Sequence, residues 1–229
     1  MNDILWTVGL TIGVYVGFYY LQDRFKISLL NPLLLTSTFI VIFLCVTNIN
    51  YDTYQEGTKM ISFFIGPATV SLALPLYEKL PILKKHWKTI ISVLIVGVIV
   101  HALTIAGIVF ILHTTDEMIA TMIPKSVTTP IAMAISESLG GIKNLTVVIV
   151  VLTGVLGILI APPIFKLFNI TSPIARGLSL GAASHAVGTT KAIEYGNLDA
   201  SVATLSLIIT GLLTVIAAPL IYQLLTWIV

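Results

Sequence analysis

The sequence predicts an all-α, polytopic integral membrane protein, and three observations point to that class. Residues of the set AVILMFWYC make up 57% of the 229 residues, whereas Asp, Glu, Lys and Arg make up only 10%. Soluble domains carry about 25% charged residues, so this chain has too little charge to cover a surface that faces water. The apolar residues form long continuous runs without the alternation of barrel strands, and helices satisfy every backbone group within lipid.

The same composition excludes several classes of function. A nucleic-acid binder needs a basic face, and here the formal net charge is only +2. No Walker A or HExxH motif is present, so we do not expect an enzyme. A single cysteine, Cys45, excludes an intramolecular disulfide framework. His101 and His113 have no partners at metal-ligand spacing, so neither a metal nor a cofactor is expected.

Eight apolar segments are each close to the length of about 20 residues that a membrane helix needs. They are residues 3–21, 29–48, 60–78, 88–113, 116–137, 144–169, 173–195 and 202–228. No polar stretch is long enough for a separate soluble domain, so we interpret residues 1–229 as one transmembrane domain. Its N-terminal half is 1–113, and its C-terminal half, 114–229, holds the most polar interrupted segments.

The loop charges predict the orientation of the chain. The densest basic cluster lies in the 79–88 loop, which holds Lys79, Lys84, Lys85 and Lys88. A cytoplasmic position for this loop places the N-terminus outside. With eight crossings, Lys166 and Arg176 would then fall outside, against the rule. A re-entrant segment, which enters and leaves the membrane on the same side, restores the alternation of cytoplasmic and external loops. The best candidate is 116–137, with PKSVTTP in its middle. Seven crossings plus a re-entrant hairpin and eight crossings both stay open.

An internal repeat is visible at an offset of 57 residues. Residues 152–168 and 209–225 are identical at seven of 17 positions. The pairs include Thr153/Thr210, Gly154/Gly211 and Pro162/Pro219, and the same offset pairs Glu137 with Glu194. The repeating unit would be a polar, interrupted segment followed by a clean apolar helix, an arrangement found in many transporters. Chance similarity between apolar sequences is the alternative.

Two polar segments at membrane depth, 124–132 and 181–194, combine helix breakers, hydroxyls and ionisable residues, and 66–77 adds breakers and hydroxyls alone. Such backbone is tolerated only where it is buried or lines a cavity, and the N-termini of broken helices are positive. A small carboxylate is the expected ligand. The candidate substrate-binding residues are Lys125, Ser126, Thr128, Thr129, Pro130, Ser184, His185, Gly188, Thr189, Thr190 and Lys191, with Thr69 and Ser71 as secondary candidates.

Each of these residues also has a structural interpretation. Threonine hydroxyls bond their own helix, Pro130 can simply kink a helix, and Lys125 can extend to a membrane interface. Lys191 and Glu194 are spaced to form a helical pair. Ionisable residues at membrane depth are expensive, however, so we interpret the cluster as functional. Because histidine titrates near neutral pH and burial favours a protonated carboxyl, His185 and Glu194 are the candidates for carrying a coupled proton.

The motifs Pro124–Ala132 (PKSVTTPIA), Gly140-Gly141-Ile142 and Pro173–Glu194 (PIARGLSLGAASHAVGTTKAIE) carry a family resemblance. Through them the chain resembles the CidB/LrgB family of bacterial membrane proteins over nearly its whole length. The resemblance implies transport of pyruvate in bacteria, and of glycolate and glycerate by the related chloroplast translocator. It also implies an alternative: regulation of murein hydrolase activity, autolysis and programmed cell death beside a small holin-like partner of the CidA/LrgA type.

The buried, interrupted segments favour the transporter, because a protein that only modulates a partner protein does not need such segments. We therefore expect transport of small monocarboxylates, of the pyruvate, glycolate or lactate class, by alternating access in the bacterial cytoplasmic membrane. The expected partners are the small anion, the lipid bilayer and a second copy in a homodimer, with no nucleic acid. Small residues at Gly177, Gly181, Ala182 and Ala183 should face another helix, within the chain or across the dimer.

Overall fold

The computed structural model describes residues 2–25, 32–64, 67, 70–71, 73–78 and 80–228. Within these ranges the chain is helical apart from short connections, and no strand is present. The all-α prediction is therefore confirmed. The chain forms two compact units, Met1–Val70 and Ser71–Val229, which are described separately. The single transmembrane domain with its two halves stays a prediction.

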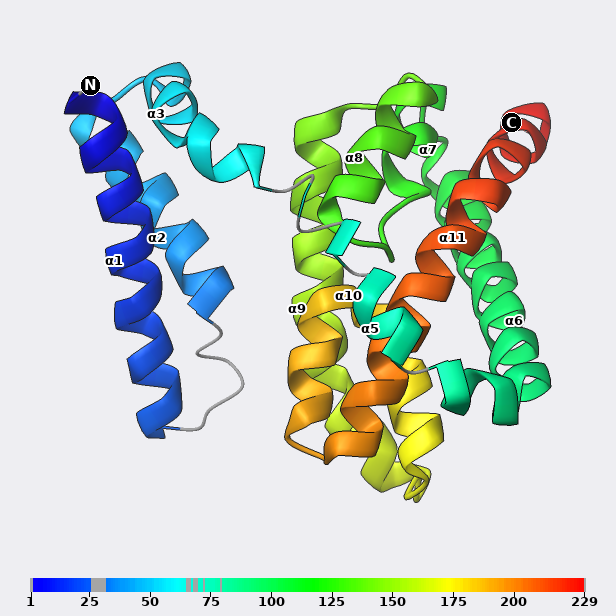
Figure 1. The fold of residues 1–229 in the computed structure, drawn as a ribbon. Helices are drawn as coiled ribbons and strands as arrows, with labels where there is room; N and C mark the ends of the chain where they lie inside the picture. The colour runs from blue at the N-terminus through cyan, green and yellow to red at the C-terminus, as the bar shows by residue number, and fades with distance from the viewer. Residues whose placement is uncertain are drawn as a thin grey trace. The chain divides into compact units, whose positions relative to one another are not determined.

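The first unit contains α1 (Asn2–Phe25), α2 (Pro32–Thr47) and α3 (Tyr51–Phe63) (Figure 1). The hydroxyls of Thr11 and Tyr54 lie 2.7 Å apart and join α1 to α3. The rings of Phe18 and Phe39 meet edge to face with centroids 6.3 Å apart, which joins α1 to α2. A polar contact and an aromatic contact thus join α1 to the other two helices.

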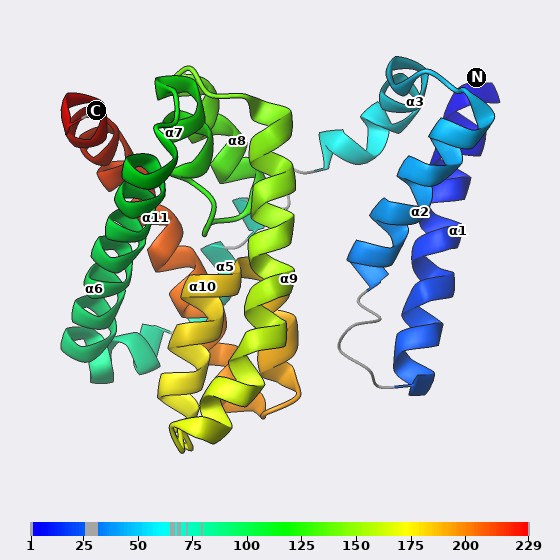
Figure 2. The same cartoon turned by 180° about the vertical axis from the view of Figure 1, so that it is seen from behind.

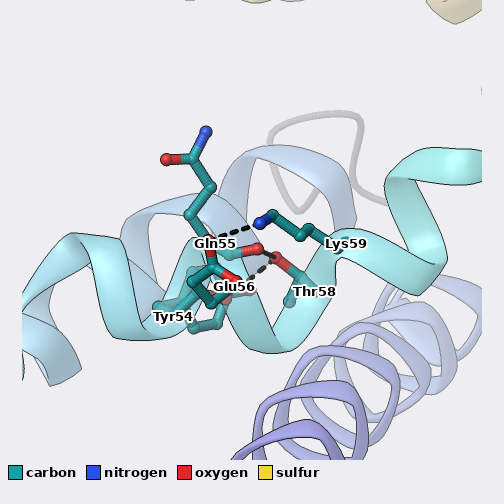
Figure 3. Close-up of polar contacts among 5 residues, drawn as sticks. All are labelled: Tyr54, Gln55, Glu56, Thr58 and Lys59. Atoms are coloured by element: carbon teal, nitrogen blue, oxygen red, sulfur yellow. Dashed lines mark hydrogen bonds and ion pairs between the residues drawn. The ribbon is translucent and has the colours of Figure 1, made fainter.

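The side chains of Glu56, Thr58 and Lys59 in α3 make their polar contacts within that helix (Figure 3). Lys59 pairs with Glu56 three residues before it, and both side chains are exposed. The Thr58 hydroxyl lies 3.0 Å from the Tyr54 carbonyl oxygen and 3.3 Å from that of Gln55. Exposed pairs of this kind contribute little to stability, so we assign this turn no function.

The second unit begins with α5 (Ala73–Glu78) and α6 (Leu80–Leu112) and continues with five more described helices. These are α7 (Asp116–Met122), α8 (Thr129–Ser138), α9 (Lys143–Leu167), α10 (Pro173–Ile193) and α11 (Asn197–Ile228). Among the described residues of the whole chain, four helices are long and apolar enough to cross a membrane: Ile4–Phe25, Lys84–Leu112, Lys143–Leu167 and Asn197–Trp227. This agrees with a membrane protein, while the number of crossings stays a prediction. Lys79 of the basic loop lies outside the described residues.

Helices α7 and α8 form a hairpin, residues 116–138, that we call the first hairpin. With 7 and 10 residues, each is only about 10–15 Å long, too short to cross a bilayer. Buried hydroxyls join it to α9: Thr146 Oγ1 lies 2.7 Å from Ser136 Oγ, and the Ile142 amide donates to Thr121 Oγ1 at 2.9 Å. Figures 1 and 2 show both helices at the end of the unit where α6 finishes and α9 begins.

Helix α10 is also a hairpin, residues 173–193, that we call the second hairpin. The backbone of His185 has φ 42° and ψ −130°, and there the chain reverses. A Cβ atom on Gly188 would overlap the Leu180 carbonyl oxygen, whereas residues eight apart in a straight helix are about 12 Å apart. Figures 1 and 2 show the two halves running in opposite directions. The reversal therefore turns one continuous segment into a second hairpin.

The base of the second hairpin is fixed by charge and by small residues. Arg176 Nε donates to Asp199 Oδ1 at 2.8 Å, and Arg176 Cζ lies 5.0 Å from the ring centre of Tyr195. A Cβ atom on Gly177 would lie 2.6 Å from the Asp199 carbonyl oxygen, and one on Gly181 would overlap α11 backbone. The prediction that these two glycines face another helix is confirmed within the chain. Because α9 runs between the two hairpin bases, the hairpins enter the unit from opposite ends.

Candidate functional site

A cavity of about 770 Å³ lies in the second unit. Its walls come from α6, the tip of the first hairpin, α9, the first half of α10, and α11. Most of the lining is apolar or small, with hydroxyls from several helices. Among the described residues that line it, Lys125 is the only Asp, Glu, Lys or Arg. The two hairpins that the sequence marked as polar interruptions therefore face a common space.

The tip of the first hairpin is held by a histidine on α6. His101 Nε2 lies 2.8 Å from the Ile123 carbonyl oxygen, and Ser126 Oγ lies 3.3 Å from His101 Nδ1. A carbonyl oxygen only accepts, so Nε2 carries the hydrogen, and a neutral imidazole then accepts from Ser126 at Nδ1. His101 is about 16 Å from Leu112 at the helix end. The tip thus lies beside the middle of α6 rather than at its end.

Lys125 lies at this tip and is partly buried. No described carboxylate lies within ion-pair distance of its ammonium group. Burying a charge without a partner is costly, and an anion in the cavity would supply that partner. Lys125 and Ser126 are the two sequence-predicted site residues that line the cavity.

The next three predicted residues begin α8 and do not line the cavity. Thr128 is the N-cap of α8, and its buried hydroxyl has no hydrogen-bond partner within the described structure. Thr129 and Pro130 form the first turn of α8. Proline is common at this position because the first turn of a helix has no acceptor for its N–H. These residues therefore start the return arm of the first hairpin.

The tip of the second hairpin is packed rather than open. Ser184 is 1% exposed, and a Cβ atom on the cavity-lining Gly157 would overlap its hydroxyl. His185 is 4% exposed, with Nε2 2.9 Å from the Val150 carbonyl oxygen. Gly154 accommodates the imidazole ring, since a Cβ there would lie 2.7 Å from it. Ser184 and His185 therefore form part of the wall behind the cavity.

The second half of α10 leads away from the cavity. The hydroxyls of Thr189 and Thr190 lie 2.7 and 3.2 Å from the Ala186 carbonyl oxygen. Lys191 Nζ lies 2.5 Å from Glu194 Oε2. These contacts match the structural alternatives that the sequence left open, and none of the four residues lines the cavity.

The remaining predicted residues contribute backbone or lie elsewhere. Gly188 allows the two arms of the second hairpin to approach closely. Ser71 is exposed and is absent from the cavity lining, and Thr69 lies outside the described residues. In the part of the chain that the structure describes, no three His, Cys, Asp or Glu residues are grouped so as to hold a metal.

Sequence reasoning missed eight polar residues that line the cavity, and four of them matter most for the argument: His101, Thr153, Thr210 and Thr214. His101 is a lone histidine in an apolar run, set aside because it has no metal-ligand partner in sequence. The repeat did contain a signal for two of the others, because it pairs Thr153 with Thr210 at the offset of 57 residues. Their meeting at one cavity depends on the packing of distant helices.

Comparison with known proteins agrees with the resemblance seen in the sequence. The protein is similar to two uncharacterized proteins of Bacillus subtilis (strain 168). YwbG is 38% identical over 210 residues, covering 92% of this chain and 93% of YwbG. YxaC is 36% identical over 214 residues, covering 93% of this chain and 92% of YxaC. No solved structure matches.

The family model described as the LrgB-like family matches residues 11–224. That range includes both hairpins, the cavity between them and most of the first unit. The match and the two relatives lead to one conclusion about identity: the chain belongs to the LrgB-like family.

Proposed function

We propose that the protein transports small monocarboxylates, of the pyruvate, glycolate or lactate class, by alternating access. The observation that carries this proposal is the cavity between two hairpins that enter from opposite ends, with Lys125 as its charged lining residue. An ammonium group with no carboxylate partner among the described residues is suited to an anion. The cavity volume of about 770 Å³ falls within the range of ligand sites.

The repeat predicted from the sequence would fit the transporter architecture if its two copies are inverted. An offset of 57 residues moves residues 116–138 onto 173–195 and α9 onto 200–224. The two target ranges nearly coincide with α10 and the greater part of α11. Each copy is therefore a hairpin followed by a long helix. Because the two hairpins enter from opposite ends, the copies would be inverted, an arrangement that transporters use for alternating access.

We further propose that both hairpins are re-entrant in the membrane. If residues 173–195 crossed it, Arg176 and Asp199 would lie on opposite sides, yet their atoms are 2.8 Å apart. With both hairpins re-entrant, Lys166 and Arg176 fall on the same side as the 79–88 loop, as the positive-inside rule favours. The external N-terminus and the bacterial cytoplasmic membrane remain predictions.

Cysteine accessibility tests this topology. In a Cys45→Ala background, single cysteines are introduced in residues 138–143 and in residues 196–200. A membrane-impermeant maleimide is then applied to either side of oriented vesicles. We expect the two groups to be labelled from opposite sides, because α9 separates the two hairpin bases. Labelling of both groups from one side would contradict two re-entrant hairpins.

In the proposed cycle each hairpin closes the cavity toward its own end of the unit. The carboxylate would bind Lys125 and Ser126, and the hairpins would open in turn. His185 and Glu194 stay the candidates for a coupled proton. The contacts of His185 with α9 support a link between its ionisation and the second hairpin.

Uptake of labelled pyruvate into proteoliposomes that contain only this protein tests the function. The vesicles carry a trapped fluorescent dye, and glycolate and lactate serve as competitors. We expect saturable, competable uptake without dye release, and its loss in Lys125→Met. Unsaturable uptake accompanied by dye release would contradict the carrier and support a holin-like pore.

The regulator of autolysis remains the alternative function. It predicts no carboxylate uptake by the protein alone, with activity only beside a CidA/LrgA-type partner. Repeating the uptake assay with that partner co-reconstituted separates the two functions, because a carrier transports pyruvate in its absence. The homodimer is tested on the same preparation by mass photometry in detergent.

A further inference from the structure

Three threonines that line the cavity have hydroxyls without hydrogen-bond partners among the described residues. In helices, threonine usually donates to the carbonyl four residues before it, and Thr204 does so on α11, 2.9 Å from Ala200 O. Thr210 is 5% exposed, and its buried hydroxyl has no partner among the described residues. Thr153 on α9 and Thr214, one turn after Thr210, also line the cavity, and no described hydrogen bond involves them.

Thr153 and Thr210 occupy equivalent positions in the two long helices. Both are followed by glycine, and each glycine faces a hairpin. A Cβ on Gly154 would lie 2.7 Å from the His185 ring, and one on Gly211 would lie 3.2 Å from Ile131 Cδ1 of α8. Each Thr-Gly pair thus places a hairpin against the glycine, and both threonines line the cavity. The same Thr-Gly arrangement therefore occurs twice around the cavity.

We propose that Thr153 and Thr210 form an uncharged half of the binding site, which hydrogen-bonds an oxo or hydroxyl oxygen on the substrate's carbon chain while Lys125 binds its carboxylate. This inference rests on the proposed transport function and adds the residues that select the substrate. A hydroxyl both donates and accepts, so one threonine serves a ketone and an alcohol equally. A substrate without this oxygen leaves the hydroxyls unsatisfied, and such sites reject it strongly.

The test compares two three-carbon acids that differ in that oxygen. Lactate and propionate compete with labelled pyruvate for uptake into proteoliposomes that contain the full chain. We expect lactate to compete at least about tenfold better than propionate with the native protein. Thr210→Val, which keeps the side-chain shape, should reduce this ratio to near one. Thr153→Val should reduce it in the same direction, and Thr210→Ser should retain it.

Thr204→Val is the matched control, because Thr204 lies on the same helix, bonds its own backbone and is absent from the cavity lining. It should leave the ratio unchanged. Equal competition by propionate in the native protein, or an unchanged ratio in both valine variants, would overturn the inference while leaving transport intact. If Thr210→Val does not fold, Thr153→Val on α9 gives the same readout. Absence of saturable uptake by the native protein would instead overturn the transport function.

Discussion

The two hairpins of the second unit contain the same kinds of residues and use them differently. The tip of the first hairpin is a non-helical turn in which Lys125 and Ser126 line the cavity. The tip of the second is a tight reversal at His185, which is 4% exposed and bonded to α9. Breakers and hydroxyls at membrane depth therefore do not by themselves identify a binding site. The two hairpins differ in whether the residues at the tip line the cavity.

The position of the lysine makes the same distinction. Lys125 lies at a tip without a carboxylate partner in the described structure, whereas Lys191 lies toward a base and pairs with Glu194. The first charge is available to a ligand, and the second is neutralised within its own helix. The predictions below test this contrast, beginning with the change of largest expected effect.

Replacing the two lysines in turn should separate ligand binding from local structure. We expect Lys125→Met to lower pyruvate uptake about 100-fold, because a hydrogen bond to a charged group is worth up to about 3 kcal/mol. Lys191→Met should change uptake by less than about threefold, since partly exposed ion pairs contribute little. Initial uptake rates at matched protein density measure both. Equal losses in the two variants would remove the distinction between the hairpins.

The packed tip of the second hairpin should be sensitive to a single added methyl group. Gly157→Ala places a Cβ against Ser184, and such overpacking costs about 1–3 kcal/mol. Gly107→Ala on α6 is the control, because a Cβ atom added at Gly107 would have no neighbouring atom within 4 Å. Thermal unfolding in detergent should show a lower Tm for Gly157→Ala alone. An equal Tm for both variants would mean that the tip is loosely packed.

The two histidines should affect different quantities. His101→Leu frees the tip of the first hairpin, and the loss of a hydrogen bond worth about 1 kcal/mol should raise the KM for pyruvate about fivefold. His185→Leu removes a buried bond from a closed tip, so it should mainly lower the Tm. Measuring KM and Tm for both variants tests the contrast. A lower Tm with unchanged KM in His101→Leu would give both histidines a structural role.

Glu194→Gln should have the smallest effect. Its side chain is 58% exposed, and solvent screening limits the contribution of such a pair to less than about 0.5 kcal/mol. We expect an almost unchanged Tm and unchanged uptake at neutral pH. A pH profile of uptake checks its second candidate role: loss of pH dependence in this variant would identify Glu194 as the carrier of the coupled proton.

The two hairpins also differ in how far the sequence could predict them. Hydropathy predicted helices throughout, and the Pro124–Pro130 segment together with the loop charges pointed to a re-entrant first hairpin. After Pro173 at its start, the second hairpin carries no proline. Its reversal depends on the positive φ of His185 and on close packing against α9 and α11. Local patterns do not encode such contacts between distant helices.

The residues of the candidate site also differ in how far the sequence could predict them. Lys125 and Ser126 were predicted because they adjoin helix breakers, and breakers are visible in sequence. Thr153 and Thr210 lie within regular apolar helices, where threonine ordinarily bonds its own backbone. Only the packing around the cavity shows that their hydroxyls remain without described partners. The predicted repeat was the sequence signal that connected Thr153 with Thr210.

The clamp at the base of the second hairpin has a mechanical consequence. With Arg176 held by Asp199 and stacked on Tyr195, the second hairpin would rotate about its base in the proposed cycle. Its first arm, from Pro173 to the reversal, is about 18 Å long, so a rotation of about 10° at the base swings the tip by about 3 Å. That displacement is the diameter of a water molecule. In the proposed cycle, such a rotation would have to break the contacts of Ser184 with Gly157 and of His185 with Val150.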